Sequence, residues 1–353
     1  MPSRFTRRQI LSRLAATGTA PLLGACAALP QDSDIAVAQP ARVAMLLPLS
    51  GPQAPLGKTM VKAVWLAEER AGLRQRVEIF DTGPTAQGAG AAAKLAEGVG
   101  AEVIVGPLFA SHTKAVVAGA PKAQVITLSN DDRLAADGAW VFGVTPAQSA
   151  EAAAGFAKKM GASSIALLQP AGEFGAQSAT ALSQAAKHHR LKMMPPASSA
   201  ETMLASLRAA NRGALPESIY LPAADKTGRQ AARIAGEAGL RAIGSLQWAD
   251  VPIAEMDRMK TMTFAGPDPK LFNSLSASYR SELGEEMGII SGLAVDAVLF
   301  ANGIPRDRSG RLQMNGRAPF DGLLGRCTFR KDRTCARDLA MLQTKDGQVR
   351  RAA

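Results

Sequence analysis

The stretch Arg42-Val-Ala-Met-Leu-Leu-Pro-Leu-Ser-Gly51 carries the clearest indication of the fold class. Its apolar run Val-Ala-Met-Leu-Leu is continuous and short, as in a strand that is buried on both faces. Pro48 removes a backbone donor and ends the strand, and residues 57–70 are predicted to form a helix. A buried strand followed directly by a helix is typical of a doubly wound α/β sheet. Ligands of such sheets bind beyond the carboxyl ends of the strands, so Ser50 and Gly51 are candidate ligand-binding residues.

Short apolar runs and helical segments alternate along most of the chain. Strands joined by helices require right-handed crossovers, so this spacing predicts parallel sheets. A break at Thr145-Pro146 divides the alternation into two successive arrays, and the tail beyond residue 320 is predicted to form a β-hairpin or meander. We expect strands at 43–47, 76–80, 101–106, 124–129, 140–144, 164–168, 217–221, 243–248 and 262–265, and helices at 57–70, 86–97, 111–120, 150–160, 175–189, 228–238, 271–283 and 291–301.

The formal net charge of +11 is distributed unevenly. Residues 306–353 hold twelve Lys and Arg against five Asp and Glu, and residues 1–25 carry four Arg and no acid. Residues 26–305 are therefore neutral overall. The aromatic residues that would stack on bases do not run among these charges, so no nucleic-acid partner is expected. A solvated surface near an anionic envelope is the simpler interpretation.

Residues 1–25 are predicted to be a bacterial signal peptide. Positive residues precede a weakly apolar stretch that ends in small residues, which is the order of a secretory signal. The paired Arg7 and Arg8 resemble the twin-arginine export signal. The alternatives are a plain signal peptide with an incidental cysteine and a short membrane helix, although the apolar region is too short and too interrupted to span a bilayer.

The segment Leu23-Gly24-Ala25-Cys26 resembles a lipoprotein box, in which the cysteine is lipidated and becomes the new N-terminus. Acyl chains on Cys26 anchor stably because each buried methylene contributes about 0.8 kcal/mol. The residue after the cysteine is Ala27, whereas lipoproteins kept in the inner membrane typically have Asp at this position. The resemblance therefore implies a periplasmic protein anchored in the outer membrane. Residues 26–40 are small, polar and bounded by proline, as in a tether.

An ordered series of motifs across residues 41–350 resembles type 1 periplasmic solute-binding proteins, with the leucine/isoleucine/valine-binding branch closest in layout. The sub-branch of lipoproteins that activate penicillin-binding proteins shares several of these motifs. The series is Leu47-Pro-Leu-Ser-Gly51, Asp81, Ile104-Val-Gly-Pro-Leu108, Ile126-Thr-Leu-Ser129, Val141-Phe-Gly-Val-Thr-Pro146, Val295-Asp-Ala-Val298 and Phe320-Asp-Gly-Leu-Leu-Gly325.

The resemblance implies two Rossmann-like lobes with parallel sheets, joined by three hinge crossings and closing on a ligand. Mapped onto this chain, lobe 1 is 41–145 plus 266–318, and lobe 2 is 146–265 plus 319–350. The expected hinges are Thr145-Pro146, Ala265-Gly266 and Pro319-Phe320, because Gly and Pro at the ends of elements suit such a role.

The resemblance also implies where a ligand would bind. Family members that bind amino acids use residues after the Gly-Pro-Leu turn and after the next strand, with further contacts from the second lobe. Together with Ser50 and Gly51, the candidate ligand-binding residues at these positions are Ser111, Ser129, Asn130, Asp131, Phe174, Gln247 and Trp248.

Cys327 and Cys335 are the cysteines that remain after Cys26. They are placed on opposite arms of the predicted hairpin around Lys331, where facing cross-strand positions are close enough for a disulfide. The periplasm is oxidising, so a Cys327–Cys335 disulfide is predicted, with two free thiols as the alternative.

Catalytic and cofactor motifs are not found in the sequence. The Gly-x-Gly-x-x-Gly, Ser/Thr-Gly-Lys and Gly-x-Ser-x-Gly patterns are missing, so neither a nucleotide cofactor nor an enzyme is expected. His188 and His189 end a helix, where they suit the negative end of the helix dipole. They have no further ligand at metal spacing, and no metal is expected.

Two functions remain as hypotheses. The first is an exported, non-catalytic lipoprotein that binds a small polar or amino-acid-like solute and delivers it to a membrane importer of the ABC type. The second is a regulatory lipoprotein that activates a penicillin-binding protein in peptidoglycan synthesis, with no solute required.

Overall fold

The computed structural model describes residues 40–73, 76–259, 261–315 and 318–352. The predicted signal peptide, Cys26 and the tether up to residue 39 lie outside the described residues. The described residues form a single compact unit. None of the helices within the described ranges combines the length and the apolar character that crossing a bilayer demands.

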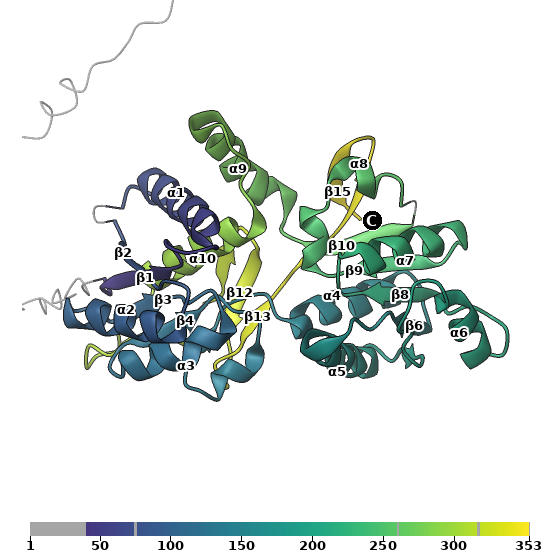
Figure 1. The fold of residues 1–353 in the computed structure, drawn as a ribbon, viewed down its shortest axis with the longest axis horizontal. Helices are drawn as coiled ribbons and strands as arrows, with labels where there is room; N and C mark the ends of the chain where they lie inside the picture. Colours follow the sequence, from purple (N-terminus) through teal and green to yellow (C-terminus); the bar gives the residue numbers. More distant parts are fainter. Residues whose placement is uncertain (1–39, 74–75, 260, 316–317, 353) are drawn as a thin grey trace, which may run out of the picture. The chain divides into compact units, whose positions relative to one another are not determined.

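The first sheet is parallel throughout, in the order β2-β1-β3-β4-β5 (Figure 1). The opening stretch forms its second strand, where Met45 pairs with Ile79 on one side and Val105 on the other. Met45 is fully buried, as predicted for a strand covered on both faces. The strands are β1 (Val43–Leu47), β2 (Glu78–Asp81), β3 (Val103–Val105), β4 (Gln124–Thr127) and β5 (Trp140–Val141).

Helices cover both faces of this sheet, and the two faces are built differently. One face is filled by small residues, Ala89, Ala93 and Val116 among them, which let α2 and α3 pack closely. The other face carries the larger apolar side chains of α1, α9 and α10. The elements are α1 (Ala54–Arg70), α2 (Ala86–Gly98), α3 (Ala110–Gly119), the 3-10 turn η1 (Asp132–Ala135), α9 (Pro269–Leu283) and α10 (Ile289–Asn302).

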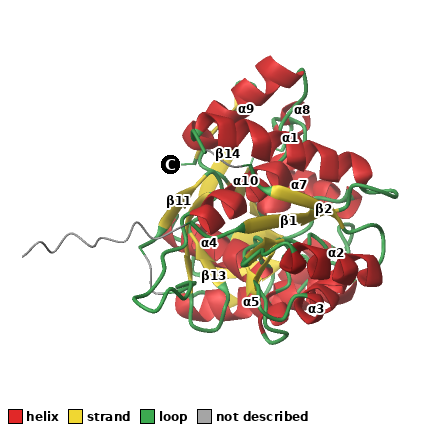
Figure 2. Ribbon diagram, turned by 90° about the vertical axis from the view of Figure 1, so that its left-hand side faces the viewer, coloured by secondary structure: helices red, strands yellow, loops and turns green. Residues whose placement is uncertain are grey.

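The second sheet has seven strands in the order β15-β14-β10-β9-β8-β6-β7, in which β14 pairs antiparallel with both β10 and β15. Its strands are β6 (Ser164–Leu167), β7 (Lys192–Met193), β8 (Ser218–Leu221), β9 (Arg241–Gly244), β10 (Met262–Gly266), β14 (Ala340–Lys345) and β15 (Gln348–Arg351). The other elements of this lobe are α4 (Pro146–Lys159), α5 (Gly172–His188), α6 (Met203–Ala210), α7 (Lys226–Glu237), η2 (Leu246–Asp250) and α8 (Ile253–Met256). Figure 2 shows the protein from a second direction, turned by 90° about the vertical axis.

The prediction was wrong about the strand expected at 243–248. The strand β9 ends at Gly244, and the following residues form the 3-10 turn η2. The Ser245 hydroxyl starts this turn by accepting a hydrogen bond from the Gln247 amide at 3.1 Å. A capping side chain of this kind competes with strand pairing. The short elements β7, α6 and α8 were not predicted at all, because elements of two to eight residues carry little periodicity.

The tail does not stay in one lobe. Residues 320–337 form the separate antiparallel sheet β11-β12-β13, with strands β11 (Phe320–Gly322), β12 (Gly325–Phe329) and β13 (Cys335–Arg337). Phe329 of β12 packs into the core of the first lobe against Phe300, and Leu324 of the β11–β12 turn belongs to the same core. The chain enters the second sheet only at β14, so the third crossing lies at Asp338-Leu339 and not at Pro319-Phe320. A hairpin pattern predicts strand pairing, but it does not reveal which core the hairpin covers.

The positions of the two cysteines within the hairpin also differ from expectation. Cys327 and Cys335 are free thiols in the structure, buried under the first lobe. The register pairs Cys327 with Arg337 and Cys335 with Phe329, so the two are diagonal neighbours and not facing residues. A hydrogen bond from the Cys327 thiol lowers the pKa of Cys335. The two thiols are thus in contact, but the prediction that they face each other directly across the hairpin was wrong.

Candidate functional site

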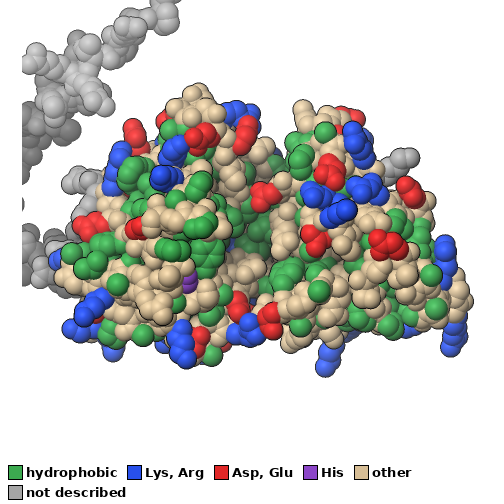
Figure 3. All heavy atoms as spheres, viewed as in Figure 1, with side chains coloured by type: hydrophobic (Ala, Val, Ile, Leu, Met, Phe, Trp, Pro, Cys, Tyr) green, Lys and Arg blue, Asp and Glu red, His purple; other side chains and the backbone are tan. Residues whose placement is uncertain are grey.

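A cavity of about 360 Å³ lies where the two sheets face each other with the carboxyl ends of their parallel strands. This is the edge at which doubly wound sheets bind ligands. Figure 3 shows hydrophobic side chains gathered in this hollow. The lining residues are Leu56, Leu108, Phe109, Leu128, Ser129, Asn130, Val144, Thr145, Pro146, Ser149, Phe174, Tyr220, Ser245, Leu246, Gln247, Asp250, Ile289, Ile290, Leu293 and Leu324.

The first lobe supplies mainly apolar walls. Leu108 and Phe109 follow the end of β3, while Leu128 and Ser129 follow the end of β4. The Ser129 hydroxyl accepts a hydrogen bond from the Asp131 amide at 3.2 Å, which holds the loop beyond β4 in place. A pocket with this many aliphatic and aromatic side chains suits a ligand with an apolar body.

The second lobe supplies most of the polar groups. The Tyr220 hydroxyl is fully buried and has no hydrogen-bond partner that meets normal geometry. Burial raises the pKa of this phenol, so it is a neutral donor at any physiological pH. Loss of hydration also raises the pKa of Asp250, opposed by the backbone amide of Ile289. Among the described residues that line the cavity, Asp250 is the one with a charged side chain.

Four of the nine predicted ligand-binding residues line the cavity: Ser129, Asn130, Phe174 and Gln247. The structure brings them together from the ends of strands in both sheets, although Ser129 and Gln247 are far apart in sequence.

Ser50 and Gly51 do not line the cavity. The Asp81 carboxylate holds their loop by accepting hydrogen bonds from the amides of Leu49 at 2.8 Å and Ser50 at 3.2 Å. A third bond comes from Gly83 at 2.8 Å. Partial burial would raise the pKa of Asp81, but hydrogen bonds from Ser50, Gly83 and Leu49 outweigh it and lower the pKa. This loop is therefore tied to β2, and the nearby wall of the cavity comes from Leu56 of α1.

Asp131 and Ser111 also lie outside the cavity. The Asp131 carboxylate is engaged by Arg133, whose Nη2 lies 2.7 Å from Oδ2 and lowers the pKa of Asp131. Arg133 also reaches across to the second lobe, where its Nη1 donates to Glu173 Oε1 at 2.6 Å. The three side chains connect the lobes beside the pocket residue Phe174. Ser111 is an exposed residue in the first turn of α3.

Trp248 is a core residue of the second lobe. Its side chain is fully buried, and its indole Nε1 donates to the Leu221 carbonyl at 2.7 Å. Gly244 makes room for the ring, because a Cβ at this position would collide with it. Since Trp248 has its partner within the core, it contributes to the cavity by fixing η2, which carries Gln247 and Asp250.

The sequence interpretation missed the apolar wall of the site, including Leu108, Phe109, Ile289 and Leu293. One signal was present, because Leu108 belongs to the Gly-Pro-Leu turn directly after a predicted strand. Tyr220 was also missed, since it lies within a continuously buried strand and nothing in the pattern says which way it faces.

Two doubly wound lobes with a cavity between their strand ends define a two-lobed binding protein. Sequence comparison gives the same result: residues 40–348 match the periplasmic binding protein family, and the chain belongs to that family. No curated protein matches the chain significantly in sequence.

Solved structures share the fold at low identity. A putative branched-chain amino acid ABC transporter protein from Rhodospirillum rubrum has a TM-score of 0.74 at 17% identity, covering 88% of this chain and all (100%) of the other. The C-domain of LpoA from Haemophilus influenzae, a regulator of PBP1A, has a TM-score of 0.69 at 18% identity, covering 88% and 99%. This chain covers 59% of full-length LpoA. A solute-binding protein from Rhodopseudomonas palustris in complex with 3,4-dihydroxybenzoic acid has a TM-score of 0.64 at 16% identity, covering 88% and 94%.

Proposed function

We propose that this chain is a non-catalytic solute-binding protein of the cell envelope that delivers a small amino-acid-like molecule to an ABC-type importer. The observation that carries the proposal is the cavity of about 360 Å³, which both lobes and the Thr145-Pro146 crossing line. This size suits one small molecule. A ligand that touches both lobes stabilises the arrangement in which they face each other.

The lining supports a ligand with an apolar body and an amino group. Leucine, isoleucine and phenylalanine side chains make up much of the wall, which matches a hydrophobic side chain. Asp250 can pair with an ammonium group, because an opposite charge stabilises the ionised carboxylate. Tyr220 offers an unused hydroxyl for a polar group such as a carboxylate oxygen.

Thermal unfolding in the presence of branched-chain and aromatic amino acids tests this proposal. We expect the binding ligand to stabilise the protein by about 2.7 kcal/mol at a concentration of one hundred times Kd. Asp250→Asn should weaken binding of the same ligand about ten- to hundredfold, since a hydrogen bond to a charged group contributes about 1.5–3 kcal/mol. Glu237→Gln, an exposed acid at the end of α7 and outside the cavity, is the matched control and should bind normally.

Benzoic acids belong in the same panel because they carry a carboxylate and no amine. If a benzoic acid binds and Asp250→Asn tightens it, the amino-acid-like ligand is wrong and an aromatic acid replaces it. If no solute stabilises the protein and a penicillin-binding protein co-purifies with it, the solute-binding function itself is wrong.

Activation of a penicillin-binding protein is the second candidate function. It is favoured by the similarity of the fold in both lobes to the LpoA C-domain, which is matched over 99% of its length. This function requires a protein partner and not a solute, so the two candidates differ in their response to the metabolite panel.

We further propose export to the periplasm, lipidation at Cys26 and a disulfide between Cys327 and Cys335. The contact between the two thiols and the lowered pKa of Cys335 support the disulfide, because the thiolate is the reactive form. A periplasmic dithiol oxidase would accept the two electrons and two protons that the thiols lose.

Mass spectrometry of the protein from the cell envelope tests both modifications. We expect an acylated N-terminal Cys26, and no alkylation of Cys327 or Cys335 in denatured, unreduced protein. Alkylation should appear at both after reduction. Two reactive thiols before reduction would contradict the disulfide, and an unmodified Cys26 would contradict the lipid anchor.

A further inference from the structure

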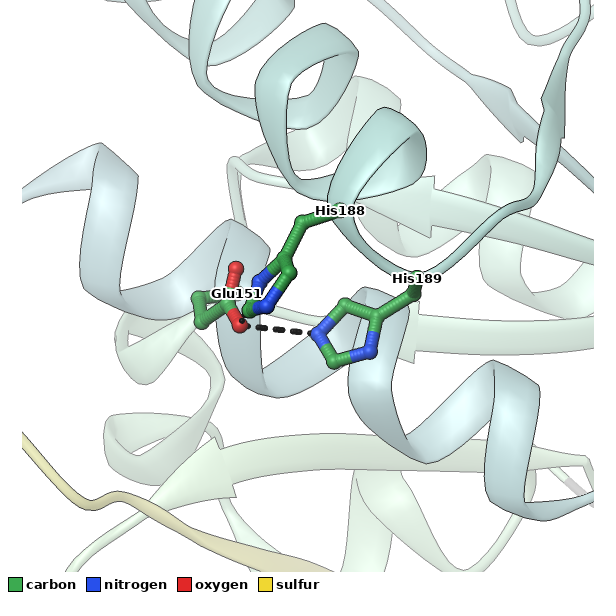
Figure 4. A group of neighbouring side chains, drawn as sticks. All are labelled: Glu151, His188 and His189. Carbon is green, nitrogen blue, oxygen red and sulfur yellow. Dashed lines mark hydrogen bonds and ion pairs between the residues drawn. The ribbon is translucent and has the colours of Figure 1, made fainter.

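Two histidines and a glutamate converge on the second lobe, away from the cavity described above. His188 and His189 stand at the C-terminal end of α5, and Glu151 lies on α4 (Figure 4). Both His188 Nδ1 and His189 Nε2 lie 2.8 Å from the same atom, Glu151 Oε1. One ligand atom from each residue falls within 4.8 Å of the others, and the described part of the chain has no second group of this kind.

The helix α4 is shaped to receive one of these rings. Glu151 and Gly155 are four residues apart and share a face of α4. A Cβ at Gly155 would lie 3.2 Å from His189 Cε1 and 3.3 Å from Nε2, so the imidazole rests directly on the glycine. Glycine inside a helix costs about 1 kcal/mol relative to alanine. Gly155 therefore destabilises α4 slightly, but it leaves the space that the His189 ring occupies.

We propose that Glu151, His188 and His189 form a binding site for a divalent transition metal ion such as Zn²⁺. Two imidazoles and a carboxylate are borderline ligands of the kind that bind zinc. Ligands at about 2.0–2.1 Å from a tetrahedral ion lie about 3.3 Å apart. Each histidine nitrogen is 2.8 Å from the carboxylate oxygen, and all three ligand atoms lie within 4.8 Å of one another, so small side-chain movements would bring them to this spacing. The side chains of His188 and Glu151 are 71% and 46% exposed, so an ion can enter directly from solvent.

Three protein ligands leave a fourth coordination position open. Glu151 and His188 also line a separate cavity of about 520 Å³, together with Gln148, Arg330 and Asp332. The ion would therefore sit at the rim of this cavity with a water or a further ligand on its open side. It would also join α4 to α5, which are otherwise held by apolar packing.

Titration of the purified protein with ZnCl₂ tests the site, with isothermal calorimetry for stoichiometry and X-ray absorption for the ligand atoms. We expect one ion per chain bound by nitrogen and oxygen at about 2.0–2.1 Å, without the distance of about 2.3 Å that cysteine sulfur gives. His188→Ala, His189→Ala and Glu151→Gln should each lower the affinity more than about tenfold. Lys187→Ala is the matched control, because it alters the same exposed helix end without removing a ligand.

Circular dichroism of each variant checks that the fold is retained, which matters most for His189 because its ring packs on Gly155. The proposal is overturned if ZnCl₂ gives no one-to-one binding, if the His188→Ala/His189→Ala double variant binds as tightly as the parent, or if the absorption spectrum shows sulfur ligands. Because the solute cavity is separate, none of these results depends on the proposed solute-binding function.

Discussion

Replacing Asp296 with alanine is expected to lower the free energy of unfolding by about 3–5 kcal/mol, as for other buried ion pairs that lose one partner. The Asp296 carboxylate is buried in α10 and accepts the amide protons of Leu323 at 2.6 Å and Leu324 at 2.9 Å. Arg337 Nη1 lies 3.6 Å from its second oxygen. Burial raises the pKa of Asp296 to about 6, and this rise is opposed by Arg337 and by the amides of Leu324 and Leu323.

The loss of stability is large because Asp296→Ala leaves the buried Arg337 charge unpaired and two backbone amides without an acceptor. Arg337 has no exposed side-chain surface, and its remaining contacts are the Phe142 carbonyl at 3.1 Å and the Phe142 ring at 4.7 Å. Neither contact neutralises a full positive charge in a buried site. The amides of Leu323 and Leu324 also lose their acceptor, and these amides hold the turn between β11 and β12.

Chemical denaturation of three variants measures this effect. Asp321→Ala is the matched control, because its partner Arg326 lies on the same small sheet but both side chains are about 60% exposed. It should cost no more than about 1 kcal/mol. The double variant Asp296→Ala/Arg337→Met should be more stable than Asp296→Ala alone, since it removes the unpaired charge. A double variant less stable than Asp296→Ala would contradict this account.

Replacing Gly143 with alanine is expected to destabilise the protein by about 3 kcal/mol, at the upper end of overpacking costs. Gly143 lies in the first crossing, between β5 and α4. An added Cβ would overlap the Ser129 carbonyl and lie 2.6 Å from the Leu128 carbonyl oxygen. These are backbone atoms, which cannot move aside as a flexible side chain can.

The same substitution should weaken ligand binding, because Leu128, Ser129 and the neighbouring Val144 line the cavity. Thermal unfolding gives the stability change, and titration of the ligand found in the panel gives the affinity. Gly98→Ala is the matched control: a Cβ there meets nothing within 4 Å at the exposed end of α2. Alanine should be neutral or stabilise by up to about 1 kcal/mol at that position. Unchanged stability and affinity in Gly143→Ala would show that the crossing is looser than the structure indicates.

Most of the fold could be predicted from local patterns. The continuous apolar run after Arg42 is β1, and the helix predicted after it is α1, extended by three residues at its start. The alternation predicts parallel sheets because each helix carries the chain back to the end of the sheet at which the previous strand began. Predictions failed where a local signal competes with a pattern, as at Ser245, which caps η2 and ends the expected strand early.

The candidate site was less predictable than the fold. Ser129 and Gln247 line the cavity as expected, because the ends of parallel strands meet at one edge. Asp131 was predicted to face a ligand, but Arg133 and Glu173 occupy its surroundings, and that ion-paired group depends on how the lobes face each other. Trp248 follows a strand, as a residue that stacks on a ligand would. Its indole Nε1 instead donates a hydrogen bond to the Leu221 carbonyl inside the core.

Local patterns are enough to predict the fold class, the family and the edge of the sheets at which a ligand would bind, because these depend on periodicity and on residues close together in the chain. Only the folded protein shows which side chains reach the cavity, where the tail crosses between the lobes, and that Glu151 contacts His188 and His189. These results depend on packing between segments many residues apart. A contact of that kind leaves no spacing in the sequence, since either partner alone is an ordinary surface or core residue. The stretch from Arg42 to Gly51 illustrates both cases. Its strand was predictable from the apolar run, whereas its loop is held away from the cavity by hydrogen bonds to Asp81, which the sequence pattern did not reveal.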